Sequence, residues 1–201
     1  MLHRVGSPLG MGKRLAATLV ALAALLSVVS VSADDVALPV PLQMALLVKV
    51  AGYDRNMAAR AGDKVRVVIL VKAGSEESTR VAATAAKALA DEDTIAGLPH
   101  EQTTLSFAGA TSLVQVCRAR RVAIVYLATG FTDEDISALA SALDGVDVLT
   151  ASAVASAVPK GIVLGFDLVS GKPKLLVHLG QARKQNVKLG AEVLKLVKVY
   201  E

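Results

Sequence analysis

Residues 161–200 read GIVLGFDLVSGKPKLLVHLGQARKQNVKLGAEVLKLVKVY, and this stretch decides the fold class more than any other part of the chain. The apolar runs at 162–169 and 174–178 are typical of strands, and the sequence SGKP at 170–173 between them is a hairpin signal. Two short helical segments follow. Because a hairpin joins antiparallel strands, a parallel sheet that contains it must be mixed.

Upstream of the hairpin, two nearly continuous apolar runs rich in β-branched residues, at 64–72 and 121–127, predict strands that are buried on both faces. Shorter strands are expected at 103–107 and 146–149. Helical patterns separate the strands, at 41–60, 76–90, 110–118 and 132–144. The sequence therefore predicts a single-domain, three-layer α/β fold with a mostly parallel mixed sheet and a C-terminal β-hairpin followed by two short helices.

The N-terminus has the pattern of a secretory signal peptide. Lys13 and Arg14 precede an apolar run at 15–26, and small residues then lead to Ala33 and Asp34. We expect a leader over residues 1–33, cleavage between Ala33 and Asp34, and a periplasmic mature chain. A membrane anchor is the alternative, but the apolar run is shorter than the roughly 20 residues that a spanning helix needs.

The mature chain is nearly neutral. Three of the 22 basic residues and none of the 18 acidic residues precede Asp34, which leaves 19 against 18 and a net charge of +1. Nucleic-acid binding would require a clustered basic face. The nearest cluster is Arg118, Arg120 and Arg121, and a position at the C-terminus of a helix explains it without a ligand. We expect no nucleic-acid partner.

The residues that metal sites and catalysis need are scarce. His100, His178 and Cys117 show no metal-ligand spacing, and the acidic run at 91–93 lacks the glycine turn of a calcium loop, which favours a solvated helix end. Cys117 is expected to be a buried, inert thiol, with an intermolecular bridge or a reactive thiol as alternatives. A hydrolase would need one of the two histidines beside a serine and a carboxylate. We predict no metal, no cofactor and no enzymatic activity.

The expected loops at the carboxyl ends of the parallel strands are the natural place for a ligand. Two helices that start there carry acidic first turns, at 76–77 and 133–135, and these carboxylates would repel a phosphate. If the domain has a ligand pocket, the pocket should lie among three glycine loops. The competing interpretation is that these glycines only form turns. The pocket residues would be Gly74, Ser75, Gly109, Thr111, Gly130 and Thr132.

The C-terminal stretch resembles the YfiR/HmsC family of periplasmic proteins. The resemblance rests on GIVLGF at 161–166, SGK at 170–172, LVHL at 176–179, ARK at 182–184, Asn186, LKL at 194–196 and an opening helix with LQMALLVK at 42–49. Asn186 suits the left-handed position at which a helix reverses. A leucine-rich last helix is expected to pack an apolar stripe at 193–197 against the sheet.

This resemblance implies that residues 34–201 form a YfiR-like domain of a periplasmic regulator. Such proteins restrain an inner-membrane diguanylate cyclase, which lowers cyclic di-GMP output, and they tend to dimerise. The expected partner is therefore an inner-membrane signalling protein, a diguanylate cyclase or a sensor kinase, with a homodimer as a further expectation. An inhibitor that binds one conformation of its partner needs no catalytic residues. The alternative function is a periplasmic sensor or carrier of a small ligand.

Overall fold

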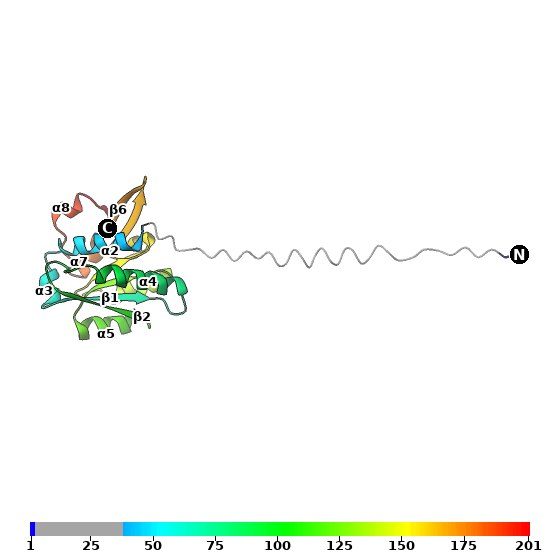
Figure 1. The fold of residues 1–201 in the computed structure, drawn as a ribbon, viewed down its shortest axis with the longest axis horizontal. Coiled ribbons are helices and arrows are strands. Elements are labelled where there is room, and N and C mark those ends of the chain that lie inside the picture. Colours follow the sequence, from blue (N-terminus) through cyan, green and yellow to red (C-terminus); the bar gives the residue numbers. More distant parts are fainter. Residues whose placement is uncertain (3–37) are drawn as a thin grey trace. The chain divides into compact units, whose positions relative to one another are not determined.

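The computed structural model describes residues 1–2 and 38–201; the expected cleavage site between Ala33 and Asp34 and most of the expected leader lie outside the described residues. Within residues 38–201, a seven-stranded sheet has the order β2-β1-β3-β4-β5-β6-β7 (Figure 1). Neighbouring strands are parallel except for the antiparallel pair of β5 and β6, so the predicted mixed sheet is confirmed. The strands are β1 (Val65–Val71), β2 (His100–Ser106), β3 (Val122–Leu127), β4 (Leu149–Ser152), β5 (Leu164–Val169), β6 (Lys172–His178) and β7 (Lys198–Tyr200).

Helices cover both faces of the sheet. The helices are α2 (Val40–Ala51), α3 (Met57–Ala61), α4 (Glu76–Ala90), α5 (Ala110–Arg120), α6 (Asp133–Ala142), the 3-10 helix η1 (Ala155–Lys160), α7 (Leu179–Lys184) and α8 (Ala191–Leu194). One apolar core layer lies under α2 and α4, and a second lies under α5 and α6. The three-layer α/β fold predicted from the sequence is therefore confirmed. None of these helices within residues 38–201 has the length and apolarity of a membrane span.

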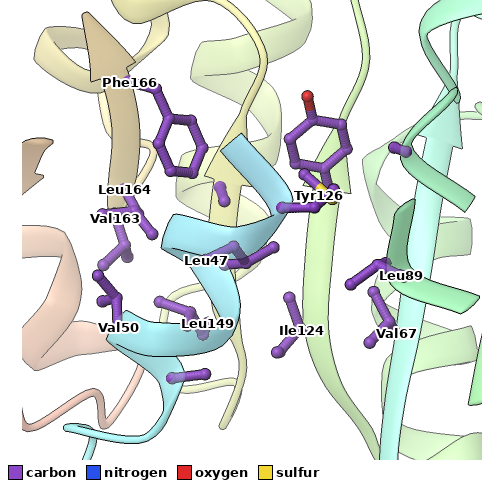
Figure 2. Packing of buried hydrophobic residues seen from close by; sticks show 14 of the residues in the cluster. Leu47, Val50, Val67, Leu89, Ile124, Tyr126, Leu149, Val163, Leu164 and Phe166 are labelled. Carbon is purple, nitrogen blue, oxygen red and sulfur yellow. The ribbon is translucent and has the colours of Figure 1, made fainter. Parts of the chain in front are cut away.

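The alternation of side chains along β1 and β3 builds the two core layers. Figure 2 shows Leu47 of α2 among side chains from β3, β4 and β5, including Ile124, Leu149 and Phe166. Val68 of β1 points to the opposite face of the sheet and belongs to the second core layer. Because each strand buries both faces, its sequence reads as an unbroken apolar run.

A buried polar link fixes α2 on the sheet. Gln43 is fully buried, and its Nε2 donates to the carbonyl oxygens of Leu38 at 3.0 Å and Ala153 at 3.2 Å. The hydroxyl of Tyr126 donates to Gln43 Oε1 at 2.8 Å. Burial raises the pKa of Tyr126, so its hydroxyl stays protonated and remains a donor. This link gives α2 one orientation, because a rotation would leave buried polar atoms without partners.

The predicted hairpin is present and its turn has two residues. Ser170 and Gly171 have φ values of 51° and 73°, as a type I′ turn requires, and Val169 pairs with Lys172. The second strand was expected to begin at 174 but begins at Lys172, because a two-residue turn places Lys172 and Pro173 in register with β5. Asn186 has a φ of 54°, which confirms the left-handed position predicted for it.

The first predicted helix, 41–60, is wrong as a continuous helix. Helix α2 ends at Ala51, a turn follows, and α3 begins at Met57. The turn places Asp54 in the protein interior, where it accepts hydrogen bonds from Arg60 and from the backbone N–H of Lys188. These long-range contacts outweigh the local helical pattern.

The strand predicted at 146–149 is shifted. Strand β4 begins at Leu149, whose partner on β3 is Ile124, while Val146 and Val148 are buried before the strand starts. The apolar residues before Leu149 are buried but do not pair as part of the strand. Residues 155–160, within a segment interpreted as loop or weak helix, form η1. The strand expected at 103–107 starts earlier, at His100, because this edge strand lacks an apolar run.

The leucine-rich last helix is shorter than predicted. Helix α8 ends at Leu194, and residues 198–200 form β7, which pairs in parallel with β6. Val193 and Val197 are buried, but Leu196 is 70% exposed, so the apolar stripe does not pack as expected.

Candidate docking surface

The glycine loops expected to form a ligand pocket lie at the carboxyl ends of β1, β2 and β3. Gly74, Gly109 and Gly130 all have positive φ. Only Gly130 and Ser75 are in close contact, since a Cβ placed on Gly130 would lie 3.3 Å from the Ser75 hydroxyl. Ser75 caps α4 and Thr132 caps α6, the latter in a full capping box with Asp135, while Thr111 lies in the first turn of α5. The loops therefore start helices and face one another at one point.

An ion pair occupies the position between the ends of β1 and β3. Lys72 Nζ lies 2.6 Å from Asp135 Oδ2 and 5.6 Å from the centroid of the Phe107 ring, which contacts Phe131 edge-to-face at 5.4 Å. Partial burial acts to raise the pKa of the Asp135 carboxyl, but hydrogen bonds from Lys72 and Thr132 outweigh it and lower that pKa. The chain crosses to opposite sides of the sheet at this point, where doubly wound folds usually bind ligands. Here the protein's own side chains fill it.

A cavity of about 40 Å³ lies beside these loops, next to Phe131 and Ser152. This volume holds one or two waters and no metabolite. Four larger cavities, of about 210 to 460 Å³, are lined by residues outside the six predicted ones. The ligand pocket at the glycine loops stays a prediction.

The histidines and the cysteine have structural positions. His178 caps α7 through a hydrogen bond from the Gln181 N–H to Nδ1 at 3.2 Å, and burial lowers its pKa. His100 Nε2 lies 2.8 Å from the carbonyl oxygen of Glu92. Cys117 is buried, as predicted from the sequence, and burial raises its pKa to about 12. In residues 1–2 and 38–201, no three His, Cys, Asp or Glu side chains are grouped as metal ligands.

Exposed apolar side chains are concentrated on one part of the molecule. Within residues 38–201, the exposed large apolar residues come only from α2, the turn after it and the segment β5 to β7; they are Leu42, Tyr53, Leu168, Val169, Leu196 and Val199. Leu42 lies on α2, the register of β5, β6 and β7 places Leu168 and Val199 on the side of the sheet that α2 covers, and Tyr53 and Leu196 line a cavity together with residues of α2. Such an accumulation marks an interaction surface more often than a random scatter does.

A groove lies at the centre of this surface, and we name it the α2 groove. It encloses about 240 Å³ and is lined by Leu46, Lys49, Val50, Tyr53, Leu175, Glu192, Val193 and Leu196. Residues 46, 49, 50 and 53 recur at helical spacing and form one wall, and Leu175 of β6 with α8 forms the other. The only charged side chains are Lys49 and Glu192, both exposed. The groove can therefore bind an apolar segment of a partner.

The far wall of the groove is held by the backbone before β7. Lys174 Nζ donates to the carbonyl oxygen of Leu196 at 3.1 Å, and the N–H of Leu196 donates to the carbonyl oxygen of Val193 at 2.9 Å. This tight turn points the exposed Leu196 side chain away from the core. Its exposure is thus a result of fixed backbone geometry.

A buried ion pair joins the two walls. Arg60 Nη1 lies 2.6 Å from Asp54 Oδ2, and both side chains are at most 2% exposed. Asp54 Oδ1 accepts from the Lys188 N–H at 2.9 Å, and the Gly190 N–H donates to the Tyr53 carbonyl at 3.1 Å. The turn after α2 is therefore bonded to the segment that leads into α8. The groove is preformed.

Sequence analysis did not identify this groove or its buried ion pair. Asp54 and Arg60 lie six residues apart, a spacing that marks no motif, and Lys188, whose N–H also bonds to Asp54, is distant in the chain. The available signal was Tyr53 with Leu42 and Leu46, which extend the apolar side of α2 beyond the width that the core needs.

Comparisons with known proteins agree with the fold. A family model described as YfiR/HmsC-like matches residues 41–198. No curated protein is similar enough in sequence to be matched.

Two solved structures share the fold. One is a conserved domain protein from Vibrio cholerae O1 biovar El Tor, at 12% identity and a TM-score of 0.56, with 81% of this chain and 60% of that chain covered. The other is an ABC domain in complex with L-Trp from Streptococcus pneumonia, at 12% identity and a TM-score of 0.52, with 75% and 62% covered. The chain thus spans about three fifths of the length of these structures, and at this identity the likeness shows the fold alone.

Proposed function

Since the chain belongs to the YfiR/HmsC-like family, we propose that it is a periplasmic, non-enzymatic regulator that binds an inner-membrane signalling protein and so affects cyclic di-GMP signalling. The partner is a diguanylate cyclase or a sensor kinase with a segment outside the cytoplasm. The observation that supports this function best is the α2 groove, an apolar, preformed surface that the fold itself leaves uncovered.

The chemistry of the groove indicates what it binds. Its lining is apolar except at the rim, where Lys49 on α2 and Glu192 on α8 carry opposite charges. An amphipathic helix or strand of the partner can bury its apolar side chains against Leu46 and Leu196, and the two rim charges favour one direction of that segment. Because the groove is preformed, binding costs little ordering of this protein. The regulator then stabilises the one partner conformation that presents this segment.

The test is co-purification from solubilised membranes of the native host, with Leu196→Glu as the variant. A glutamate placed in the groove would lose its hydration on binding, so we expect the variant to lose the diguanylate cyclase or kinase that the wild type retains. Leu196 is 70% exposed in the free protein, so the variant should remain folded. Cellular cyclic di-GMP should rise in the same variant.

Val169→Glu is the matched control. Val169 is 49% exposed, lies next to Leu168 on β5 and therefore points to the opposite face of the sheet. This control should retain the partner. If Val169→Glu abolishes binding as fully as Leu196→Glu does, or if the wild type captures no cyclase or kinase, the proposed docking site is wrong.

A second copy of the chain is a competing occupant of the groove. Sedimentation of the wild type and of Leu196→Glu distinguishes the two: a dimer that the variant converts to monomer would assign the groove to self-association, and the partner would then need another surface.

The cellular location belongs to the same proposal. N-terminal sequencing of the protein from a periplasmic fraction should begin at Asp34. A chain that starts at Met1 and fractionates with the cytosol would contradict a periplasmic regulator.

The alternative function, a small-ligand sensor, depends on the loops at Gly74, Gly109 and Gly130. A metabolite that binds there would raise the melting temperature by mass action. The wild type is compared with Gly130→Val, in which the added side chain would crowd Ser75. A metabolite that shifts the wild type and not the variant would favour the sensor, and equal shifts would exclude these loops.

A further inference from the structure

A second surface, on the opposite face of the sheet, is rich in arginine. A cavity of about 360 Å³ lies on the α5 side of the sheet, at the amino ends of β1 and β3, and no residue lines both this cavity and the α2 groove. Its lining includes Arg66, Glu101, Arg120 and Arg121. In Figure 1, α5 and α2 lie on opposite sides of the strands. We name this cavity the arginine cavity.

A charged residue on the floor of the cavity interrupts an otherwise apolar strand. Arg66 is the one charged residue of β1, and it lies on the same face as the buried Val68. It is held in place by Glu101 at 3.3 Å and Asp63 at 3.3 Å. The cavity leaves this part of the sheet open, and the guanidinium of Arg66 is accessible, with 25% of its side chain exposed.

One residue in the wall of the cavity has an unfavourable backbone conformation. Arg121 follows the last residue of α5 with φ 50° and ψ 51°, the left-handed conformation that glycine adopts most easily at this position. Its guanidinium atoms lie 3.3 Å from the place a Cβ on Gly62 would take, and Nη2 lies 3.5 Å from the Ala59 carbonyl oxygen. A glycine would cap α5 without this strain, whereas the arginine places a guanidinium in the lining of the cavity.

The charges of the lining do not cancel. The lining holds three guanidinium groups and one carboxylate, that of Glu101, which also pairs with Lys64 at 3.1 Å; Asp63, beside the lining, pairs with Arg66 alone. Within the described part of the chain, Arg120 is exposed and forms no ion pair. The C-terminus of α5 contributes about half a negative charge, which is too small to neutralise the excess.

The basic surface extends past Arg121. A neighbouring cavity of about 210 Å³ is also lined by Arg121 and adds Arg118, so both cavities meet at the same guanidinium. Guanidinium groups remain charged at any physiological pH and match phosphate oxygens in a bidentate geometry. The volume of the arginine cavity lies within the roughly 300–1,000 Å³ typical of ligand sites.

We propose that the arginine cavity binds a phosphate-bearing anion through Arg66, Arg120 and Arg121. The phosphate is supplied either by a free anion or by the headgroup of an anionic lipid. This site is independent of the α2 groove and of the partner that the groove binds.

The test uses the full chain in a phosphate-free buffer of low ionic strength, where screening is weak. One arm titrates inorganic pyrophosphate by calorimetry, and the other measures cosedimentation with vesicles of phosphatidylcholine that contain or lack phosphatidylglycerol. The variant is Arg120→Ser with Arg121→Gly, and we expect its affinity to be at least about tenfold weaker because two charge-assisted contacts are lost. Arg121→Gly removes the left-handed strain at its position, so the helix cap should persist.

The control is Arg80→Ser with Lys87→Ser, which removes the same charge from exposed positions on α4. It should keep the wild-type affinity. Saturable binding of pyrophosphate that only the cavity variant weakens assigns a free anion, and the same pattern restricted to phosphatidylglycerol vesicles assigns a lipid headgroup. Binding that the control weakens equally would be diffuse electrostatic attraction and would overturn the proposal, as would the absence of binding to both probes.

Discussion

The region at the carboxyl ends of β1 and β3 differs from the α2 groove in whether its surface groups already have partners within the protein. At the carboxyl ends, Lys72 pairs with Asp135, Ser75 caps α4 and Thr132 caps α6, so the polar groups of this region bond to one another. In the α2 groove, Tyr53 and Leu196 are exposed apolar side chains, and Leu46 is only partly buried.

This difference shows where the protein can gain free energy by binding. A region whose charges are already paired must break these pairs before it accepts a ligand. An open apolar surface loses only water when a partner covers it. The sequence directs attention to the first region, because parallel strands usually bind ligands there, whereas the second region offers the larger gain.

Among the ion pairs, the largest loss of stability is expected when the support of the groove is removed. Asp54→Ala removes one of the two carboxylates that pair with the buried guanidinium of Arg60, the other being Asp147 at 2.7 Å, and we expect the free energy of unfolding to fall by about 1.5–3 kcal/mol. Urea denaturation measures this loss. Lys184→Ala, which removes an exposed ion pair with Asp144, should change stability by about 0.5 kcal/mol or less. Equal effects of the two variants would show that the groove walls are not joined through Asp54.

A smaller effect is expected at the carboxyl ends. Lys72→Met breaks the pair with Asp135 and should cost about 0.5–1 kcal/mol at neutral pH, because both side chains are partly exposed. The folded-state pKa of Asp135 is lowered, so its contribution is complete above the unfolded value of about 3.9 and is lost as the pH falls through the folded-state value.

The wild type should therefore lose this contribution below about pH 4, and Lys72→Met should lose less over the same range. Denaturation curves at neutral pH and at pH values below 4 measure the difference. Lys87→Met, at an exposed lysine of α4, is the control and should follow the wild type. A parallel acid response in Lys72→Met would mean that Lys72 does not lower the pKa of Asp135.

The smallest effect on stability is expected for a substitution in the lining of the groove. Leu196→Ala should change the free energy of unfolding by about 0.5 kcal/mol or less, because the side chain is 70% exposed. Leu47→Ala, on the buried side of α2, should cost about 2–5 kcal/mol. Thermal unfolding compares the two. A large loss for Leu196→Ala would make the groove a part of the core and not a docking surface.

Local pattern was sufficient for much of the fold. The runs at Val65–Val71 and Val122–Leu127 became central strands, since a strand buried on both faces must be apolar throughout. Ser75 and Thr132 became helix caps, because a cap acts within one turn of the chain.

The errors came where distant residues compete with local pattern. The helix predicted to continue past Ala51 stops because Asp54 bonds with Arg60 and Lys188, and the last helix stops because residues 198–200 pair with β6. Lys188 and β6 lie outside any short window of sequence around these breaks, so helical periodicity cannot report them.

The α/β class, the hairpin at Ser170 and Gly171 and the resemblance to the YfiR/HmsC family follow from the amino-acid order alone, because these depend on neighbours along the chain or on short motifs. That Leu46 and Leu196 face one groove, and that Arg66 and Arg121 face one cavity, is visible in the folded structure only. Whether a residue is exposed depends on which other segments cover it, and the sequence does not show which segments meet.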